Sequence, residues 1–183
     1  GIRTLAITDH NYIEDIKYLQ YKDMVLIQGS EISALFNDLD GNKSEIHIVA
    51  LGFDENNEKI KDVIKRNQLN TFNYINMILE KLRLCGIDIG TYEYLKEINS
   101  GKTNFGRSLI AKEMVKRGYC KSVKEVLDEY IGDFGSKRAY VENPLDYVSL
   151  KEVIEAIKDA SGIPVLAHLY CYNFDNRNNH YLL

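Results

Sequence analysis

The sequence predicts a mixed α/β fold in which a helical segment interrupts a barrel or sheet of strands. Short apolar or alternating runs, typical of strands, occupy the first 52 residues and recur near residue 163. Residues 56–131 instead carry apolar side chains three or four positions apart, which is the period of an α-helix. We therefore predict two barrel portions, 1–55 and 146–183, and a helical insertion subdomain over 56–145.

The elements follow from these patterns in chain order. Turn-forming residues at 37–42 predict a hairpin between two of the strands, and Gly86 and Gly162 are predicted helix ends. Ser122, followed three residues later by Glu125, has the spacing of a helix-capping pair. The predicted strands are 3–8, 24–28, 31–36, 45–52 and 163–167, and the predicted helices are 12–20, 57–84, 91–98, 107–117, 122–131 and one around 150–157.

Composition narrows the class of protein. The 183 residues are 45% hydrophobic, which is enough for a folded core, and the formal net charge is −4. A protein that grips long nucleic acid usually has a basic surplus, so we expect no long duplex partner. No apolar run is long enough for a membrane span, and no membrane partner is expected. Three widely spaced cysteines favour a reduced, cytoplasmic protein.

Three histidines stand at or near predicted strands. His10 and His168 each follow an apolar strand, and strand ends line the active face of α/β barrels. His47 lies within the strand 45–52, and Glu31 follows an apolar strand and Gly29. Imidazole and carboxylate together bind transition metals. A single histidine at a strand end is more often a hydrogen-bonded structural residue, so the hypothesis of a metal site depends on the whole set.

Four short motifs resemble those of the PHP (polymerase and histidinol phosphatase) family. Thr-Asp-His at 8–10 is similar to its "TDH" signature, and Gly-Ser-Glu-Ile-Ser at 29–33 to its "G-x-E" motif. Residues 45–52 resemble the next family segment, and Val-Leu-Ala-His at 165–168 resembles its "AHP" motif, with Leu169 in place of proline. The resemblance implies a partial, distorted (β/α)7 barrel, because all four motifs occur in the family's order.

The helical insertion is similar to that of one branch of this family. Residues 106–111, 116–119 and 137–141 resemble the insertion of the bacterial enzymes that dephosphorylate 3′,5′-nucleotide bisphosphates or trim RNA from its 5′ end. The insertion argues against histidinol phosphatase or polymerase-associated activity, by family analogy alone. Arg107 and Arg138 are implied to bind substrate phosphate. By physics alone, Arg107 would be a solvated cation that opposes the helix dipole.

The resemblance also implies the chemistry. His10, Glu31, His47 and His168 would be the metal ligands and catalytic residues, with two or three ions of manganese, zinc or iron in a complete site. The expected function is a metal-dependent phosphoesterase that hydrolyses phosphate monoesters of small nucleotides, or a short RNA 5′ end, with metal-activated water. The alternative is a degenerate domain that binds nucleotide or phosphate without turnover.

The sequence departs from the family at both ends. The opening "H-x-H" and closing "D-x-H" motifs are absent, and Asp175 and His180 have the wrong spacing to replace the latter. We favour a chain truncated at both ends over a natural domain that folds without these strands, since isolated ligands would have little use. An open barrel would also expose strand edges, through which the chain could self-associate.

Overall fold

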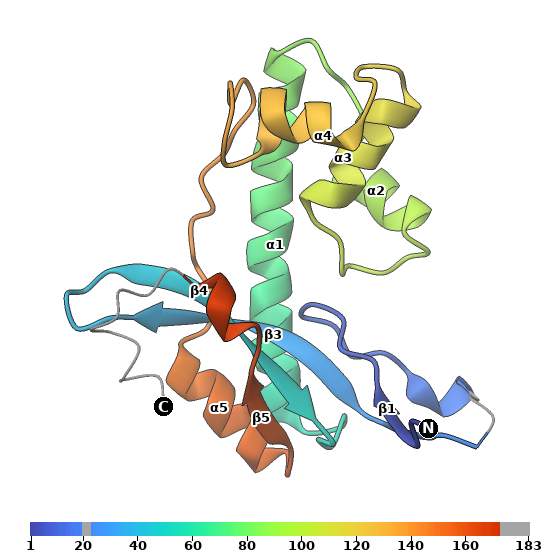
Figure 1. Ribbon diagram of the computed structural model, residues 1–183, viewed down its shortest axis with the longest axis vertical. Coiled ribbons are helices and arrows are strands. Elements are labelled where there is room, and N and C mark those ends of the chain that lie inside the picture. The colour runs from blue at the N-terminus through green and yellow to red at the C-terminus, as the bar shows by residue number, and fades with distance from the viewer. Residues whose placement is uncertain (20–22, 173–183) are drawn as a thin grey trace. The chain divides into compact units, whose positions relative to one another are not determined.

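The computed structural model describes residues 1–19 and 23–172, which form two compact units (Figure 1). The first unit contains Gly1–Asn67 and the chain from Leu145 onward, and the second contains Gln68–Pro144. Sheets and helices are both present, which confirms the mixed α/β class. Within the described residues the strands form two small open sheets and no closed barrel.

The first unit contains both sheets. Strands β1 (Thr4–Ala6) and β2 (Val25–Ile27) pair in parallel. Strands β3 (Gly29–Asn37), β4 (Lys43–Leu51) and β5 (Ile163–Leu166) form an antiparallel sheet in that order. The predicted hairpin joins β3 to β4. The Asp38 carboxylate closes it, since it accepts hydrogen bonds from the backbone N–H groups of Asp40 and Asn42 at 2.9 and 2.8 Å.

The two faces of the antiparallel sheet have different chemistry, because successive side chains on a strand alternate between faces. One face is apolar and fully or almost fully buried, and it includes Ile32, Ile46 and Ile48. It packs in one core with the first part of α1 (Glu58–Leu84) and with α5 (Leu150–Asp159), which lies beside the sheet in Figure 1. The opposite face of β3 and β4 carries Glu31 and His47.

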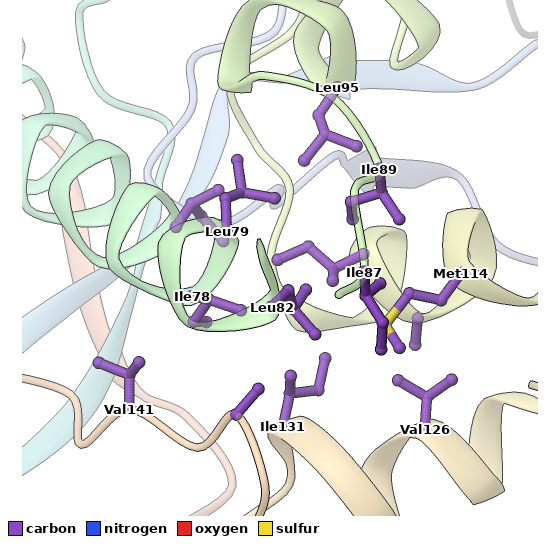
Figure 2. Packing of buried hydrophobic residues seen from close by; sticks show 14 of the residues in the cluster. Ile78, Leu79, Leu82, Ile87, Ile89, Leu95, Met114, Val126, Ile131 and Val141 are labelled. Atoms are coloured by element: carbon purple, nitrogen blue, oxygen red, sulfur yellow. The ribbon is translucent and has the colours of Figure 1, made fainter. Parts of the chain in front are cut away.

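The second unit is helical. It contains the remainder of α1, then α2 (Tyr92–Ile98), α3 (Arg107–Lys116), α4 (Val123–Val126) and the π-helical turn η2 (Leu127–Ile131). Residues 68–144 are all described, and none of them belongs to a strand. Figure 2 shows the apolar core of this unit, in which Ile78, Leu79 and Leu82 of α1 meet Met114 of α3 and Val126 of α4. Among the described residues, no helix has both the length and the apolar character that a bilayer crossing requires.

Two predicted helices differ from the structure. The helix expected over 12–20 is wrong for the described residues, which contain only the 3₁₀ turn η1 (Ile16–Tyr18). Asn11 has a φ of +46° and its backbone N–H donates to the Glu31 carbonyl at 2.8 Å, so tertiary hydrogen bonds hold this stretch against β3. The helix expected over 122–131 is an α-helical turn followed by η2, with the predicted Ser122 cap in place.

Candidate metal centre

The site lies where three segments of the first unit meet. The chain after β1 runs beside β3, because His10 and Glu31 form a parallel bridge and the Glu31 N–H donates to the Asp9 carbonyl at 3.1 Å. His47 lies on the neighbouring strand β4, with its side chain on the same face as Glu31. His168 follows β5, which pairs with β4 through Leu166. Backbone pairing therefore gathers all four predicted ligands.

The Glu31 carboxylate is the centre of this cluster. Its Oε1 atom lies 2.8 Å from Nδ1 of His47 and 3.0 Å from Nε2 of His168. These two ring nitrogens are 3.1 Å apart. Nδ1 of His10 lies farther out, 3.9 Å from the same oxygen. His10, Glu31 and His47 each offer one ligand atom within 4.8 Å of the others.

The donor set fits a small divalent cation. In a tetrahedral site with bonds of about 2.0–2.1 Å, the ligand atoms lie about 3.3 Å from one another. The Glu31 oxygen and the two ring nitrogens are 2.8, 3.0 and 3.1 Å apart, so these atoms need to move apart only slightly to reach that geometry. Two imidazoles and one carboxylate are also ligands that zinc, manganese and iron accept.

Electrostatics keep this site polar and charged. Desolvation raises the pKa of Glu31, but hydrogen bonds from His168 and His47 and the nearby His10 outweigh it, so the pKa of Glu31 is lowered. Desolvation likewise lowers the pKa of His47, yet the carboxylates of Glu45 and Glu31 raise it overall. Each imidazole thus sits beside an anion, an arrangement that also suits a bound cation.

Backbone geometry at the site is unusual. Asn11 and His168 have φ angles of +46° and +29°, a region that costs free energy for residues other than glycine. A buried amide network secures Asn11: its Nδ2 donates to Oγ of Ser33 at 3.0 Å, and Nδ2 of Asn67 donates to its Oδ1 at 3.1 Å. This network fixes the backbone next to His10.

Gly29 explains why a glycine precedes the carboxylate. A Cβ atom at this position would lie 2.6 Å from the Ile7 carbonyl oxygen and 2.9 Å from the Thr8 methyl group. Such distances are far below ordinary contact, so only glycine lets the end of β1 pass this close to β3. The glycine of the "G-x-E" motif therefore serves the close approach that brings His10 to Glu31.

The two predicted phosphate ligands lie in the second unit. The Arg107 guanidinium donates to both carboxylate oxygens of Asp133, at 2.9 and 3.0 Å, and to the Ile131 carbonyl at 3.2 Å. In this structure the anion that Arg107 binds is therefore the carboxylate of Asp133. Arg138 lies 3.5 Å from the carboxylate of Glu129. Phosphate binding by either arginine stays a prediction, and Asp175 and His180 lie outside the described residues.

Sequence reasoning assigned no role to two further residues at the site. Oε1 of Glu45 lies 3.1 Å from Nε2 of His47, on the side of the ring away from Glu31. The Tyr172 hydroxyl accepts a hydrogen bond from the His47 backbone N–H at 2.7 Å. The alternation along β4 places Glu45 on the same face as His47, so its position near the site could have been predicted from the sequence. No local pattern predicts the contact of Tyr172, which is 125 residues from His47 in the chain.

Solved structures of other proteins resemble this chain, and two of them are informative. One is a protein of Bifidobacterium adolescentis that is proposed to be a metal-dependent phosphoesterase, with 22% identity and a TM-score of 0.73 over 100% of this chain and 64% of that one. The other is an amidohydrolase from Chromobacterium violaceum with bound sulfate and no metal, with 22% identity and a TM-score of 0.78 over 98% of this chain and 61% of that one. The chain thus spans less than two thirds of either neighbour, and likeness at this identity establishes the fold. No family model matches the chain, and no curated protein matches its sequence.

Proposed function

We propose that this chain carries the metal centre of a phosphoesterase that hydrolyses phosphate monoesters of small nucleotides. The observation that carries the proposal is the convergence of His47 and His168 on one oxygen of Glu31, at 2.8 and 3.0 Å, with His10 nearby. The first neighbour is itself proposed to be a metal-dependent phosphoesterase. The second binds sulfate, a tetrahedral oxyanion that resembles phosphate.

The finer assignment is to the PHP family and its nucleotide bisphosphate phosphatase branch. The support for this assignment is the order of the four sequence motifs. Each motif contributes one candidate metal ligand, and all four candidates lie in the first unit. In this proposal residues 1–55 and 146–183 are part of a (β/α)7 barrel, and 56–145 are its helical insertion. The longer chains of both neighbours are compatible with a more complete barrel than the described strands form.

The residues divide the work as follows. Glu31, His47 and His168 would hold one divalent ion. His10, together with Glu31, would hold a second ion. Such ions lower the pKa of coordinated water and neutralise charge on a phosphoryl group. Glu31 holds the imidazoles in place through its shared oxygen, which keeps their ring nitrogens directed at a common point. Arg107 and Arg138 are proposed phosphate ligands, and for Arg107 phosphate would replace Asp133.

The decisive assay measures inorganic phosphate released from a 3′,5′-bisphosphonucleotide in the presence of manganese. We expect Glu31→Gln to reduce the rate by about 100-fold or more, because it removes the charge at the centre of the cluster. The matched control is Glu155→Gln, an exposed carboxylate on α5 that lies 3.8 Å from Lys151, and it should leave the rate unchanged. Release that needs no metal, or that survives Glu31→Gln, contradicts the proposal.

Two comparisons in the same assay define the substrate. Nucleotide binding by calorimetry without phosphate release, independent of metal, would indicate a binding module in place of an enzyme. Faster hydrolysis of histidinol phosphate than of the bisphosphonucleotide would move the assignment to another activity of the family. We expect hydrolysis of the nucleotide to be the faster of the two.

A further inference from the structure

We infer that Phe134 of the second unit is a base-stacking residue, which binds the nucleobase of the nucleotide whose phosphate Arg107 is proposed to bind. The inference rests on the proposed function for the class of ligand and not for its hydrolysis. Phe134 lies in the loop 132–138 after η2 and is 85% exposed. Within residues 1–19 and 23–172, this is the largest exposed fraction of any large apolar residue.

Hydrogen bonds fix the loop that carries Phe134. The Ser136 N–H donates to the Asp128 carbonyl at 2.9 Å, and Oγ of Ser136 donates to the Glu129 carbonyl at 2.7 Å. Gly135 has a φ of +91°, and a Cβ atom there would lie 1.9 Å from the Asp128 carbonyl oxygen. The ring therefore stands on a fixed support. Because a ring kept in water gains none of the free energy of burial, packing does not account for a phenylalanine here.

Positive charge lies directly beside Phe134. Asp133, its neighbour in the chain, binds the Arg107 guanidinium at 2.9 and 3.0 Å. The hydrogen bond from Arg107 lowers the pKa of Asp133, and nearby Lys137 lowers it further. Two cations thus share one carboxylate. Residues 68–144 contain 12 Lys and Arg against 10 Asp and Glu, whereas the whole chain contains 23 against 27. The second unit is therefore the part of the chain better suited to an anionic ligand.

The tyrosine rings near this loop already have cationic partners. Nζ of Lys137 lies 4.5 Å from the ring centroid of Tyr140, and the guanidinium carbon of Arg138 lies 5.5 Å from that of Tyr130. Among the residues that the structure describes, Phe134 has neither a cation over its ring nor a stacked aromatic neighbour. Phe134 is thus the aromatic ring of this loop that is open to a ligand.

A ring beside cations suits a ligand that is both aromatic and anionic. Bases stack on the rings of phenylalanine and tyrosine, and guanidinium groups bind phosphate. One sugar joins the base of a nucleotide to its phosphate, so a single nucleotide reaches both Phe134 and Arg107, which adjoin through Asp133. Stacking tolerates every base, because each base has a π-face. We therefore expect the loop to bind nucleotides with little preference among bases.

The test compares two ligands that differ chiefly in the base, adenosine 5′-monophosphate and ribose 5-phosphate. Calorimetry is carried out with manganese and again with EDTA, which prevents metal-dependent turnover. We expect Phe134→Ala to weaken binding of adenosine 5′-monophosphate about 5- to 150-fold, the range that loss of base stacking gives, and to leave ribose 5-phosphate within about twofold. Phe134→Tyr, which keeps a ring, should bind both ligands like the wild type. Arg107→Gln should weaken both.

Phe134→Trp gives an independent readout, because the chain contains no tryptophan. Adenosine 5′-monophosphate should quench the indole fluorescence of this variant with the calorimetric Kd, and ribose 5-phosphate should leave it unchanged. The matched control is Leu84→Trp, at a 77% exposed position that ends α1 in the same unit, and neither ligand should quench it. Circular dichroism should show the same thermal midpoint for Phe134→Ala and the wild type, since the ring is not buried.

Several outcomes overturn the inference: no binding of adenosine 5′-monophosphate under either condition, binding to Phe134→Ala within twofold of wild type, or an equal loss for both ligands. A dimer in sedimentation that Phe134→Ala abolishes, with nucleotide affinity unchanged, would assign the ring to a contact between copies. Nucleotide binding that needs Phe134, without phosphate release from the bisphosphonucleotide, would end the proposed function and leave this inference standing. Metal-dependent release with an unchanged kcat/KM in Phe134→Ala would do the reverse.

Discussion

Single atoms decide the chemistry of the candidate centre. Oε1 of Glu31 contacts two imidazole nitrogens at hydrogen-bonding distance, whereas His10 lies 3.9 Å away with a side chain that is 58% exposed. The four predicted ligands are therefore not equivalent. Glu31, His47 and His168 form a tight group of three donor atoms, and His10 stands at its edge.

This difference predicts an order of metal affinities. We expect His168→Ala to weaken binding of the tightest zinc or manganese ion by at least about tenfold, because it removes one of the three closest donor atoms. His10→Ala should weaken that first ion less and reduce the binding of a second. Calorimetric titration of both variants measures this. A larger loss of the first ion in His10→Ala would show that the tight group is not the primary site.

Glu113 is the residue through which acid should destabilise the second unit. Its side chain is 3% exposed and accepts hydrogen bonds from Nε of Arg117 at 2.7 Å and from the Tyr94 hydroxyl at 2.8 Å. Desolvation raises the pKa of Glu113, but these bonds and Lys116 lower it below the ordinary 4.5. A lowered pKa gives stability that is present above the unfolded value and lost as pH falls through the folded value.

We therefore expect the free energy of unfolding to decline below about pH 4.5, where the unfolded state binds the extra proton. Glu113→Gln should cost about 1–3 kcal/mol at neutral pH, because it weakens charged hydrogen bonds in a buried setting. The variant should also show a shallower acid decline. Urea unfolding of both proteins at several pH values measures this, and parallel curves would assign the acid sensitivity to other groups.

At the scale of elements, one asparagine on α1 joins three separate segments. Nδ2 of Asn67 donates to the Ser33 carbonyl of β3 at 2.6 Å and to Oδ1 of Asn11, and its Oδ1 accepts from the Val148 N–H at 3.1 Å. The residue is fully buried. It therefore satisfies backbone groups of β3 and of the segment before α5 that no water could reach.

Asn67→Ala should lower the free energy of unfolding by about 2–4 kcal/mol, because it leaves buried donors and acceptors without partners. The matched control is Asn73→Ala, an exposed position on the same helix, which should change it by less than about 0.5 kcal/mol. Chemical denaturation followed by circular dichroism compares the two. Equal effects would mean that the network contributes little to stability.

The strands and helices differ in how far the sequence could predict them. The alternation of Ile46, Ile48 and Ala50 indicated β4, and the turn-forming residues at 37–42 indicated the hairpin that joins it to β3, because both are local signals. The mistaken helix over 12–20 failed for the opposite reason. Asn11 is held by hydrogen bonds to β3, about twenty residues away in the chain, and no local pattern reports such contacts.

The site shows the same division. The position of each imidazole after or within an apolar strand was readable, and so was the carboxylate after Gly29. The isolated bridge between the chain after β1 and β3 could not be predicted, although it brings His10 to Glu31. The carboxylate partner of Arg107 was equally hidden, because Asp133 lies 26 residues further along the chain.

For the whole molecule, the main feature is that α1 contributes to two separate cores. Its first part packs with the antiparallel sheet through Ile60, Val63 and Ile64, and its later part packs among helices through residues such as Leu82. Each unit thus has buried apolar residues of its own, which is the usual mark of a cooperative folding unit.

Leu82→Ala should therefore destabilise the second unit by about 2–5 kcal/mol, because it removes a fully buried side chain. Hydrogen exchange should accelerate within 68–144 and much less within 1–67. Metal affinity should stay within about twofold of wild type. The matched substitution Ile46→Ala, in the other core, should show the reverse pattern of exchange and reduce metal affinity. Equal acceleration across the chain in both variants would indicate one cooperative unit.

The junction between β2 and β3 restricts how this sequence can vary. The chain leaves one sheet at Ile27 and enters the other at Gly29, with Gln28 alone between them. Because the hairpin fixes the register of β3 against β4, insertion of a single residue between Gly29 and Glu31 would leave Glu31 on its face and would instead move Gly29 out of its close approach to Ile7 and Thr8. Homologous sequences that keep this chemistry should therefore tolerate length changes in the hairpin at 38–42 and none between Gly29 and Glu31.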